Sequence, residues 1–418
     1  VSVCIAGSTG SGKTTIMAWL LSNVPNNQRL ITIEEGSREF DLVKREGPIS
    51  RASLAKRTGL SPTSMTRIVN VLKRIGLISE HSVAQAGVAG RPSTLLEICA
   101  DAAYCLCVDA MPNVSKVTLV DMATKQAVYR ELVTVSGTSF ETVADELNAM
   151  LGEMCRDAGI TRDRIACCGM SISGHVLRNG YIAASSQMQW ADIDGVGILE
   201  RALDMPAIVE NDCKAALLGE QYLLSCAGES TANMAYVKFG WAGVGSAAMV
   251  DGMLLRGSRN AAGEIGHFNS QLEGLSGDKC EFKGCFEHTI SESAVIEHAR
   301  SINPACASLA GVNEAIANGD ERIIKLMNDI CEYIAIAVSD ISCAYNSDRI
   351  ILSGNIITNL ADCYQNVLRY VERRLTRSVQ PNLQVCLSKM GTNASLYGMS
   401  CLAVEETIKR LLSNDTGF

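Results

Sequence analysis

The residues best suited to chemistry are the run Glu210-Asn211-Asp212, which lies between a short apolar stretch and a helical one. A carboxylate and an amide at the end of a strand lie where α/β proteins collect their ligands. Asp212 is also a suitable helix N-cap, because its side chain can accept hydrogen bonds from the amides of a first turn. From the residues alone, a ligand site and a helix cap are equally good interpretations.

A second group of polar residues follows further along the chain. Glu264 and His267 are three residues apart and share one face if their segment is helical. Cys280, Cys285 and Glu287 come next, in a short loop that contains glycine. A single histidine in an apolar stretch is more often structural, but thiolates close behind it are ligands that zinc prefers. The group therefore indicates either a structural histidine or part of a metal site.

A third group is a glycine-rich turn near the start of the chain. It reads GSTGSGKT and satisfies the Walker A pattern, whose amides and lysine hold nucleotide phosphates. The run resembles the core of secretion ATPases of the type II/IV or tight-adherence pilus class. Because this resemblance ends before any second acidic strand, residues 1–43 are predicted to be a P-loop fragment from a fusion or a chimeric gene. The phosphate-binding residues would be Gly7, Gly10, Gly12, Lys13 and Thr14.

The elements that position these groups belong to a large globular chain. With 418 residues, the chain is long enough for two or more hydrophobic cores. No apolar run reaches the roughly twenty residues of a transmembrane helix, so we expect no membrane partner. The 17 cysteines are scattered through apolar stretches, which is typical of reduced, buried thiols in a cytoplasmic protein. The chain begins at Val1 without a signal pattern, and we expect a fragmentary or processed start.

Charge is unevenly distributed along the chain. The segment from Lys44 to Arg91 holds nine basic and two acidic residues, a net charge of +7, within a chain whose net charge is −8. A small basic segment on a large acidic body indicates a nucleic-acid-binding head, although a solvated helical surface would give the same count.

The same segment has the pattern of a winged helix-turn-helix. Ser50 is suited to cap a helix that runs through Thr58, Gly59 makes a turn, and Ser61-Pro62 begins a second helix that ends near Arg74. Apolar residues then form one face at helical spacing: Leu54, Ala55, Leu60, Met65, Ile68, Val69, Leu72 and Ile75. The residues left to contact a major groove, together with Arg91 in a basic wing, are Ser61, Thr63, Ser64, Thr66, Arg67 and Asn70.

The run GPISRASLAKRTGLSPTSMTRIVNVLKRIGLISE, followed by Gly90-Arg91-Pro92, resembles the DNA-binding head of the ROK family (repressors, open reading frames, kinases). The resemblance implies an α/β protein in which a winged helix-turn-helix (44–98) precedes a two-lobed, actin-like ATPase (sugar-kinase) fold. Lobe 1 would span 99–210 with a C-terminal helix from 395 to 418, and lobe 2 would span 211–394. Apolar runs predict the strands of the two lobes: Tyr104–Val108, Lys116–Val120, Ile165–Ile172, Ala207–Val209, Met234–Phe239 and Arg349–Leu352.

The resemblance also assigns roles to the chemical groups. The sugar-binding residues would be Asn211, Asp212, Glu264, His267 and Glu287, with Asp212 the general base if the chain were a kinase. The string CEFKGCFE is similar to the end of the zinc motif C-x-C-G-x-x-G-C-x-E, with a loop that is one residue longer. The metal ligands implied by this match are His267, Cys280, Cys285 and, in place of the first cysteine, Asp278. Zinc would be structural.

Kinase activity is not favoured by the phosphate-binding turns. The family's first turn, D-x-G-x-T, reads Asp109-Ala110-Met111-Pro112-Asn113, which lacks the glycine and one backbone N–H. A later turn keeps Gly243 and Gly245 but places Trp241 beside them. Binding of ATP and Mg²⁺ is therefore not expected.

These observations predict a sugar-responsive DNA-binding repressor. Its partners would be operator DNA, an effector sugar bound between the two lobes, and a second copy of the chain, because a head that reads two half-sites is expected to act as a dimer or a higher oligomer. The alternative is an NTP-using enzyme: a sugar kinase of the family, or the fused secretion-ATPase fragment. The helix-turn-helix head favours the repressor, because kinases of the family lack it.

Overall fold

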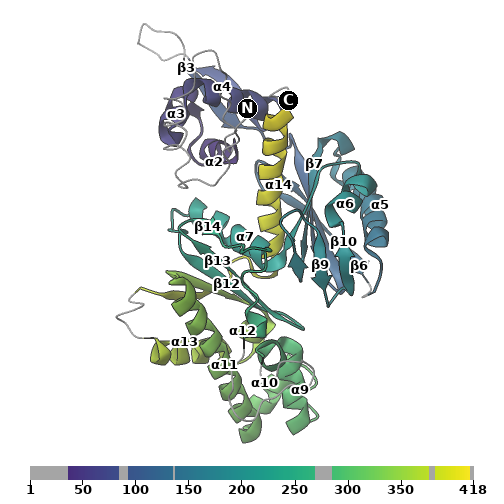
Figure 1. Cartoon of the computed structure of the whole chain (residues 1–418), viewed down its shortest axis with the longest axis vertical. Helices are drawn as coiled ribbons and strands as arrows, with labels where there is room; N and C mark the ends of the chain where they lie inside the picture. Colours follow the sequence, from purple (N-terminus) through teal and green to yellow (C-terminus); the bar gives the residue numbers. More distant parts are fainter. Residues whose placement is uncertain (1–35, 84–92, 135–136, 269–284, 376–381, 415–418) are drawn as a thin grey trace. The chain divides into compact units, whose positions relative to one another are not determined.

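The computed structural model describes residues 36–83, 93–134, 137–268, 285–375 and 382–414. The chain divides into two units: unit 1 comprises residues 1–98 together with 408–418, and unit 2 comprises residues 99–407. Figure 1 shows the elements of each. In the described part of the chain, no helix combines the length and the apolarity needed to cross a membrane.

Within residues 36–98, the described part of unit 1 holds helices α2, α3 and α4 beside a small antiparallel sheet in the order β1-β3-β2. Ser50 and Ser61 cap the second and third helices as predicted, each by accepting a hydrogen bond from the backbone N–H three residues later. Gly59 ends the second helix with a left-handed φ of 74°, which glycine adopts without strain. The elements are α2 (Gly36–Glu46), β1 (Ile49–Ser50), α3 (Arg51–Thr58), α4 (Pro62–Arg74), β2 (Ile78–Val83) and β3 (Ser93–Ile98).

The core of unit 1 is formed by the apolar faces of these helices. Most of the predicted face is buried, whereas Leu60 and Ile75 are half-buried. Helix α2 was not predicted; it places Phe40 and Val43, each 1% exposed, in the head, so the folded head begins before Lys44. The buried residues from the predicted face are Leu54, Ala55, Met65, Ile68, Val69 and Leu72.

The first lobe of unit 2 is built on a five-stranded sheet in the order β11-β7-β4-β5-β6. Strands β4, β7 and β11 are parallel, while β5 is antiparallel to β4 and β6. Helix α5 (Phe140–Ala158) and helix α6 (Gly195–Leu203) contribute buried apolar residues to the same core. The strands are β4 (Tyr104–Ala110), β5 (Asn113–Asp121), β6 (Ala127–Thr134), β7 (Ile165–Ile172) and β11 (Ala207–Asn211), and a second, antiparallel sheet holds β8 (His175–Val176), β9 (Ile182–Ser185) and β10 (Trp190–Ile193).

The second lobe has a sheet of similar plan, in the order β14-β13-β12-β15-β16. Strands β12, β15 and β16 are parallel, and β13 is antiparallel to β12. Its core lies between the sheet and a group of helices led by the 25-residue α11. The elements are β12 (Met234–Phe239), β13 (Val244–Val250), β14 (Met253–Leu254), β15 (Arg349–Ser353), β16 (Gln384–Leu387), α8 (Glu287–Ile290), α9 (Glu292–Ile302), α10 (Leu309–Ala317), α11 (Glu321–Tyr345), α12 (Asn355–Asn359) and α13 (Cys363–Arg374).

Helices α7 (Asp212–Cys226) and α14 (Ala394–Asn414) pack closely against each other. A Cβ added to Gly219 or Gly398 would meet backbone atoms of the other helix within about 2.3 Å, so both positions require glycine. Helix α14 also contacts the first lobe, where Lys125 Nζ donates to the Ser400 carbonyl at 3.1 Å. The predicted strands are present, and the predicted C-terminal helix is present as α14 up to Asn414, while residues 415–418 lie outside the described residues.

Candidate functional site

Asn211 ends β11 and caps helix α7. Its Oδ1 accepts hydrogen bonds from the backbone N–H groups of Cys213 and Lys214, at 3.0 and 3.1 Å. Its Nδ2 donates to the Gly174 carbonyl at 3.0 Å. The N-cap role that the sequence allowed for Asp212 therefore belongs to Asn211, and Asp212 is the first residue of the helix.

Asp212 forms an ion pair that the sequence did not predict. Its Oδ2 lies 2.8 Å from Nζ of Lys238 on β12, and its Oδ1 accepts from the backbone N–H of Cys213 at 2.9 Å. The Asp212 side chain is 5% exposed and the Lys238 side chain 30%. Burial lowers the pKa of Lys238, but the charges of Asp212 and Asp109 outweigh it and hold that pKa above its usual value.

Asp109, at the end of β4, is the second carboxylate near this lysine. It is 3% exposed, and its Oδ1 accepts a hydrogen bond from Ser171 Oγ at 2.7 Å. Burial raises the pKa of Asp109 above its ordinary value, although Lys238 acts in the opposite direction. The segment that matches the family's first phosphate-binding turn, Asp109 to Asn113, thus contributes a carboxylate whose charge Lys238 partly offsets.

Glu210 belongs to a buried network that reaches the segment before Glu264. Arg256 Nη1 donates to Glu210 Oε2 and, at 3.0 Å, to Asn260 Oδ1. Asn260 Nδ2 donates to Glu210 Oε1 at 3.1 Å and to the Val176 carbonyl at 2.8 Å. Since Glu210 is 6% exposed, this network fixes the end of β11 to the segment 256–260.

The predicted sugar-binding residues Glu264, His267 and Glu287 lie near one another. Glu264 precedes the short helix η2 (Ile265–His267) and His267 ends it. Both are exposed, whereas Glu287 is half-buried at the start of α8. A Cβ placed on Gly266 would lie 3.1 Å from Glu287 Oε2, so the glycine leaves room for that carboxylate. Burial raises the pKa of Glu287, and Glu264 adds to the shift while His267 and His288 oppose it.

Only two of the predicted zinc ligands, His267 and Cys285, lie within the described residues. Asp278 and Cys280 lie outside them. The buried Cys285 Sγ is 3.0 Å from Nδ1 of His288, so a thiol and an imidazole meet here. Across the described residues, no group of three metal-ligating side chains is present.

The predicted DNA contacts on α4 are mostly accessible. Ser61, Thr63, Thr66 and Asn70 are exposed, and Ser64 and Arg67 are partly exposed. Arg67 Nη2 donates to the carbonyl of Leu412, near the end of α14 and within the same unit. Arg91 in the wing lies outside the described residues.

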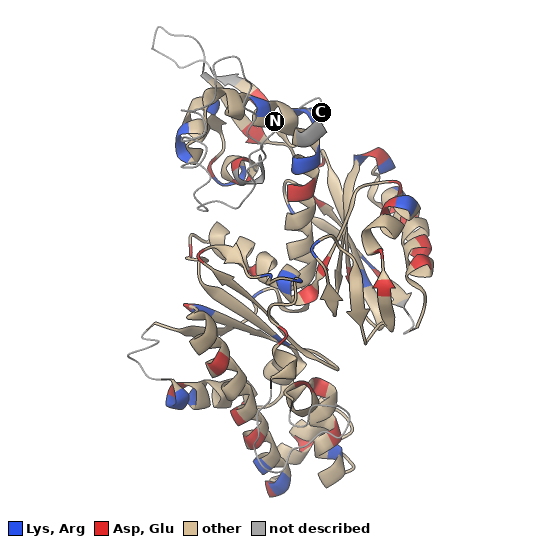
Figure 2. Ribbon diagram, viewed as in Figure 1, with Lys and Arg blue, Asp and Glu red and all other residues tan. Residues whose placement is uncertain are grey.

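The acidic residues of the basic segment are engaged within unit 1. Glu80 accepts from Arg51 and Lys73, and Glu46 accepts from Arg57. In Figure 2, blue segments of the ribbon mark Lys and Arg positions along the helices of this unit. Pairing within the head therefore accounts for both acidic residues and leaves an excess of basic ones.

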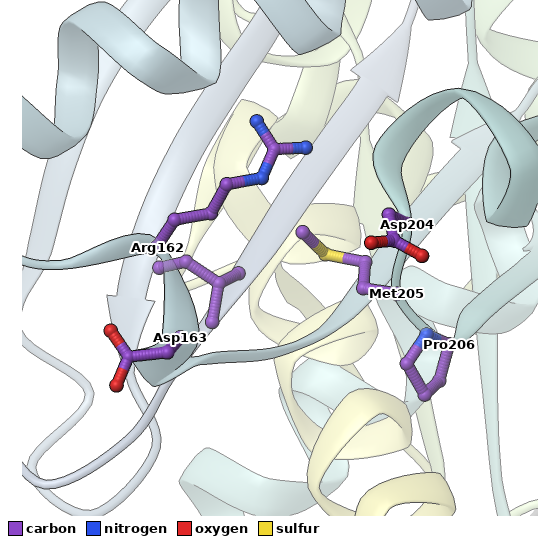
Figure 3. Close-up of a pocket in the computed structure, with 6 residues that line it drawn as sticks. Arg162, Asp163, Asp204, Met205 and Pro206 are labelled. Carbon is purple, nitrogen blue, oxygen red and sulfur yellow. The ribbon is translucent and has the colours of Figure 1, made fainter.

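The Walker A residues Gly7, Gly10, Gly12, Lys13 and Thr14 all lie outside the described part of the chain. A pocket of about 370 Å³ is present elsewhere, at the amino ends of β7 and β11 (Figure 3). It is lined by Arg162, Asp163, Ile165, Asp204, Met205 and Pro206. The Arg162 guanidinium is held by the Leu203 carbonyl at 2.7 Å. Because Asn211 lies at the carboxyl end of β11, this pocket is separate from the candidate site.

Sequence reasoning missed Lys238, Arg256 and Asn260. Lys238 carried a signal, because it is a single cation in the otherwise apolar strand Met234–Phe239. Arg256 and Asn260 carried none, since their partner Glu210 is at least 46 residues away along the chain.

Comparison with known proteins supports both parts of the chain. Residues 105–406 match the ROK family model, and residues 41–79 match a winged helix-turn-helix DNA-binding model. The chain is 24% identical over 383 residues to the xylose repressor of Bacillus spizizenii, covering 91% of this chain and 95% of the repressor. It is 24% identical over 263 residues to the glucokinase of Halalkalibacterium halodurans, covering 59% of this chain and 79% of the kinase.

A solved structure resembles both units. It is a ROK family transcriptional regulator described as a homolog of the E. coli MLC protein, with a TM-score of 0.75 and 20% identity, covering 90% of this chain and 96% of that one. This likeness confirms the predicted fold class. The chain therefore belongs to the ROK family, with a winged helix-turn-helix in front of a sugar-kinase-like fold.

Proposed function

We propose that this protein is a transcriptional repressor that binds operator DNA through α4. Binding of a sugar would change its affinity for that DNA. The observation that carries the proposal is the presence of a winged helix-turn-helix and a sugar-kinase-like fold in one chain. The similarity to xylose repressors over about nine-tenths of the chain supports the same combination. Such a protein would act in the cytoplasm, where its operator is.

The head has the properties that DNA binding needs. Helix α4 begins with exposed small polar residues, including Thr63 and Thr66, which can approach base edges and phosphates. The basic excess of the segment from Lys44 to Arg91 would supply phosphate contacts. A dimer would place two such helices on two half-sites of the operator.

The effector would bind near the end of β11. Sugar hydroxyl groups need several hydrogen-bonding partners, and the candidate residues supply carboxylates, an amide and an imidazole. Asn211 and Asp212 are held in place by the hydrogen bonds of the α7 cap and by Lys238. Glu287 approaches from α8, near Glu264 and His267. These groups come from separate elements, so a bound sugar would link them.

We also propose a structural zinc ion, held by His267, Cys280, Cys285 and Asp278. The thiol of Cys285 already lies beside the His288 imidazole, and sulfur and nitrogen donors suit zinc. The ion would order the loop that leads to Glu287. Purified protein should contain about one zinc per chain by elemental analysis, and Cys285→Ser should lower that content. Protein purified without chelators that contains no zinc would refute this assignment.

Selection of duplexes from a random DNA library with the full-length protein tests the repressor function. The protein should enrich one sequence, and its affinity for that duplex should fall steeply with salt because phosphate contacts release counterions. Adding D-xylose or D-glucose should then change the affinity at least about fivefold, the lower end of ordinary allosteric coupling. Equal affinity for the enriched and a scrambled duplex would refute DNA recognition, and no response to either sugar would count against sensing.

A further inference from the structure

Lys238 is the charged residue of a buried strand. Its neighbours on β12, Val237 and Phe239, are both 0% exposed, yet Lys238 keeps its side chain 30% exposed. Its ammonium lies 2.8 Å from Asp212 Oδ2. The residue therefore reaches from the sheet of the second lobe to the first residue of α7.

The same ammonium also interacts with the first lobe. Asp109 on β4 is close enough for its charge to raise the pKa of Lys238, and Lys238 in turn acts to lower the pKa of Asp109. Lys116 on β5 is a second nearby cation; burial lowers its pKa, and Asp109 opposes that shift. Lys238 thus forms an ion pair with Asp212 and acts through its charge alone on Asp109, a buried carboxylate of the other lobe.

This arrangement does not fit the cofactors of a sugar kinase. Phosphoryl transfer uses divalent cations held by carboxylates, and backbone amides that hold the phosphates. Here Asp212 already pairs with Lys238, and a Mg²⁺ ion held by Asp212 and Asp109 would bring two further positive charges beside that ammonium. Pro112 removes an amide from the first turn, and the second turn carries a bulky residue, Trp241, which is 59% exposed.

We propose that Lys238 is a resident counter-ion in place of metal and nucleotide, so that the site binds an uncharged, unphosphorylated sugar. This inference rests on the proposed sensing function and specifies the ligand of that site. Carboxylates outnumber the cations around it, and two of the cations, Lys238 and Arg256, already pair with Asp212 and Glu210. The nearby Lys116 ammonium donates to Thr392 Oγ1 at 2.7 Å and to Asn393 Oδ1 at 3.2 Å, so these three cations are already engaged. A sugar phosphate would therefore add negative charge where no cation among the three is free to neutralise it.

The test uses the full-length protein and three variants. Lys238→Met removes the charge at similar length, Lys238→Arg keeps it, and Lys389→Met is a matched control that removes a lysine from the exposed pair with Glu229. Binding of Mn²⁺ alone is followed by electron paramagnetic resonance, and binding of MgATP by calorimetry. D-xylose, D-glucose and glucose 6-phosphate are compared by thermal shift.

We expect wild type, Lys238→Arg and Lys389→Met to bind neither Mn²⁺ nor MgATP detectably. Lys238→Met should gain Mn²⁺ affinity of about tenfold or more, the effect of roughly one pKa unit of charge interaction, because Asp212 loses its counter-ion. The gain should disappear in Lys238→Met combined with Asp212→Asn. A free sugar should stabilise the wild type, and glucose 6-phosphate should not.

Binding of MgATP by the wild type would overturn the inference, and so would equal Mn²⁺ binding by Lys238→Met and Lys389→Met. If Lys238→Met does not fold, the wild-type measurements with MgATP and glucose 6-phosphate still decide. A response to glucose 6-phosphate alone would overturn the inference and leave the sensing function standing. No response to any sugar, together with Mn²⁺ gain in Lys238→Met, would support the counter-ion and refute the sensing function.

Discussion

The exposed face of α4 and the buried group around Asp212 use polar residues in opposite ways. On α4, Thr63 and Asn70 are exposed, and within the described residues their side chains form no hydrogen bond. Around Asp212, the polar side chains of Asn211 and Glu210 are less than 10% exposed, and each holds another residue in place. The polar groups on α4 are available to an external partner, whereas those around Asp212 already form hydrogen bonds with other residues of the chain.

This difference has a measurable consequence. A substitution at Thr63 or Asn70 should change affinity for DNA with little effect on folding, because neither side chain forms a hydrogen bond within the described residues. A substitution in the buried group should change the stability of the fold, because it leaves a buried partner unsatisfied.

Glu210→Ala should have the largest effect. It removes the carboxylate that accepts from Arg256 and Asn260, and so leaves a partly buried guanidinium unpaired. We expect the free energy of unfolding to fall by about 3 kcal/mol, as for other broken buried pairs. Denaturant unfolding followed by circular dichroism measures it.

Glu229→Ala is the matched control for Glu210→Ala. Glu229 also accepts from two cations, Arg349 and Lys389, but it lies at a more exposed position, at 34%. Water can replace the lost contacts there, so its effect should be clearly smaller. Equal losses of stability in the two variants would contradict the distinction between buried and exposed pairs.

Asn70→Ala should weaken binding to the selected operator by about 10- to 100-fold, or roughly 1–3 kcal/mol, the value of one good base contact. The free energy of unfolding should change by less than about 0.5 kcal/mol. Fluorescence anisotropy with the labelled duplex measures the affinity. Asn318→Ala, at an exposed site outside the head, is the control, and an equal loss of affinity there would remove the assignment of α4 as the recognition helix.

Local signals predicted the head better than the site. Ser50, Gly59 and Ser61 act through residues three or four positions away, so spacing alone locates the helices that they begin and end. Helix α2 escaped prediction because its segment was assigned to the boundary of the P-loop fragment. Because α2 begins at Gly36, the head extends into the segment assigned to the P-loop fragment, while the fragment itself lies mostly outside the described part and stays a prediction.

The site depends on contacts that spacing does not contain. Lys238 meets Asp212 only because β12 runs beside the start of α7, and Arg256 meets Glu210 across 46 residues. The sequence indicated that Glu210, Asn211 and Asp212 lie at a strand end, but it left the cap and the ligand site as equal interpretations. The structure assigns the cap to Asn211 through two hydrogen bonds to backbone N–H groups.

Asn211→Ala tests that assignment and should have a moderate effect. Loss of an N-cap costs about 1 kcal/mol in typical proteins. Asn211→Ser keeps a capping oxygen but loses the donor to the Gly174 carbonyl, so it should recover most of the stability while sugar binding stays impaired. Urea unfolding and thermal shift with sugar measure the two effects. Full stability of Asn211→Ala would contradict the capping role.

The smallest effect concerns pH, and it compares one acid from each region. In the head, Glu80 is partly buried, but its bonds to Lys73 and Arg51 outweigh burial and lower its pKa below the ordinary value of 4.5. Glu80 therefore stabilises the fold above that ordinary value, and this contribution is lost as the pH falls through the lowered pKa. In the site, burial outweighs Lys238 and raises the pKa of Asp109 above its ordinary value of 3.8.

The contribution of Asp109 to the stability of the fold should therefore change with pH in the opposite direction to that of Glu80. The folded state holds the proton of Asp109 more tightly than the unfolded state, so its contribution to stability is complete below pH 3.8 and is lost as the pH rises through the raised pKa. Asp109→Asn keeps an oxygen that accepts the hydrogen bond from Ser171, but it cannot lose a proton in this range. The free energy of unfolding of this variant should therefore increase relative to wild type as the pH rises from 4 toward 7. The increase should be smaller than the effect of Asn211→Ala. Glu80→Gln should instead lose stability relative to wild type over the same rise. Urea unfolding of the three proteins across this range measures how the stability of each variant relative to wild type changes with pH. If both differences changed in the same direction, the opposite pKa shifts of Glu80 and Asp109 would be refuted.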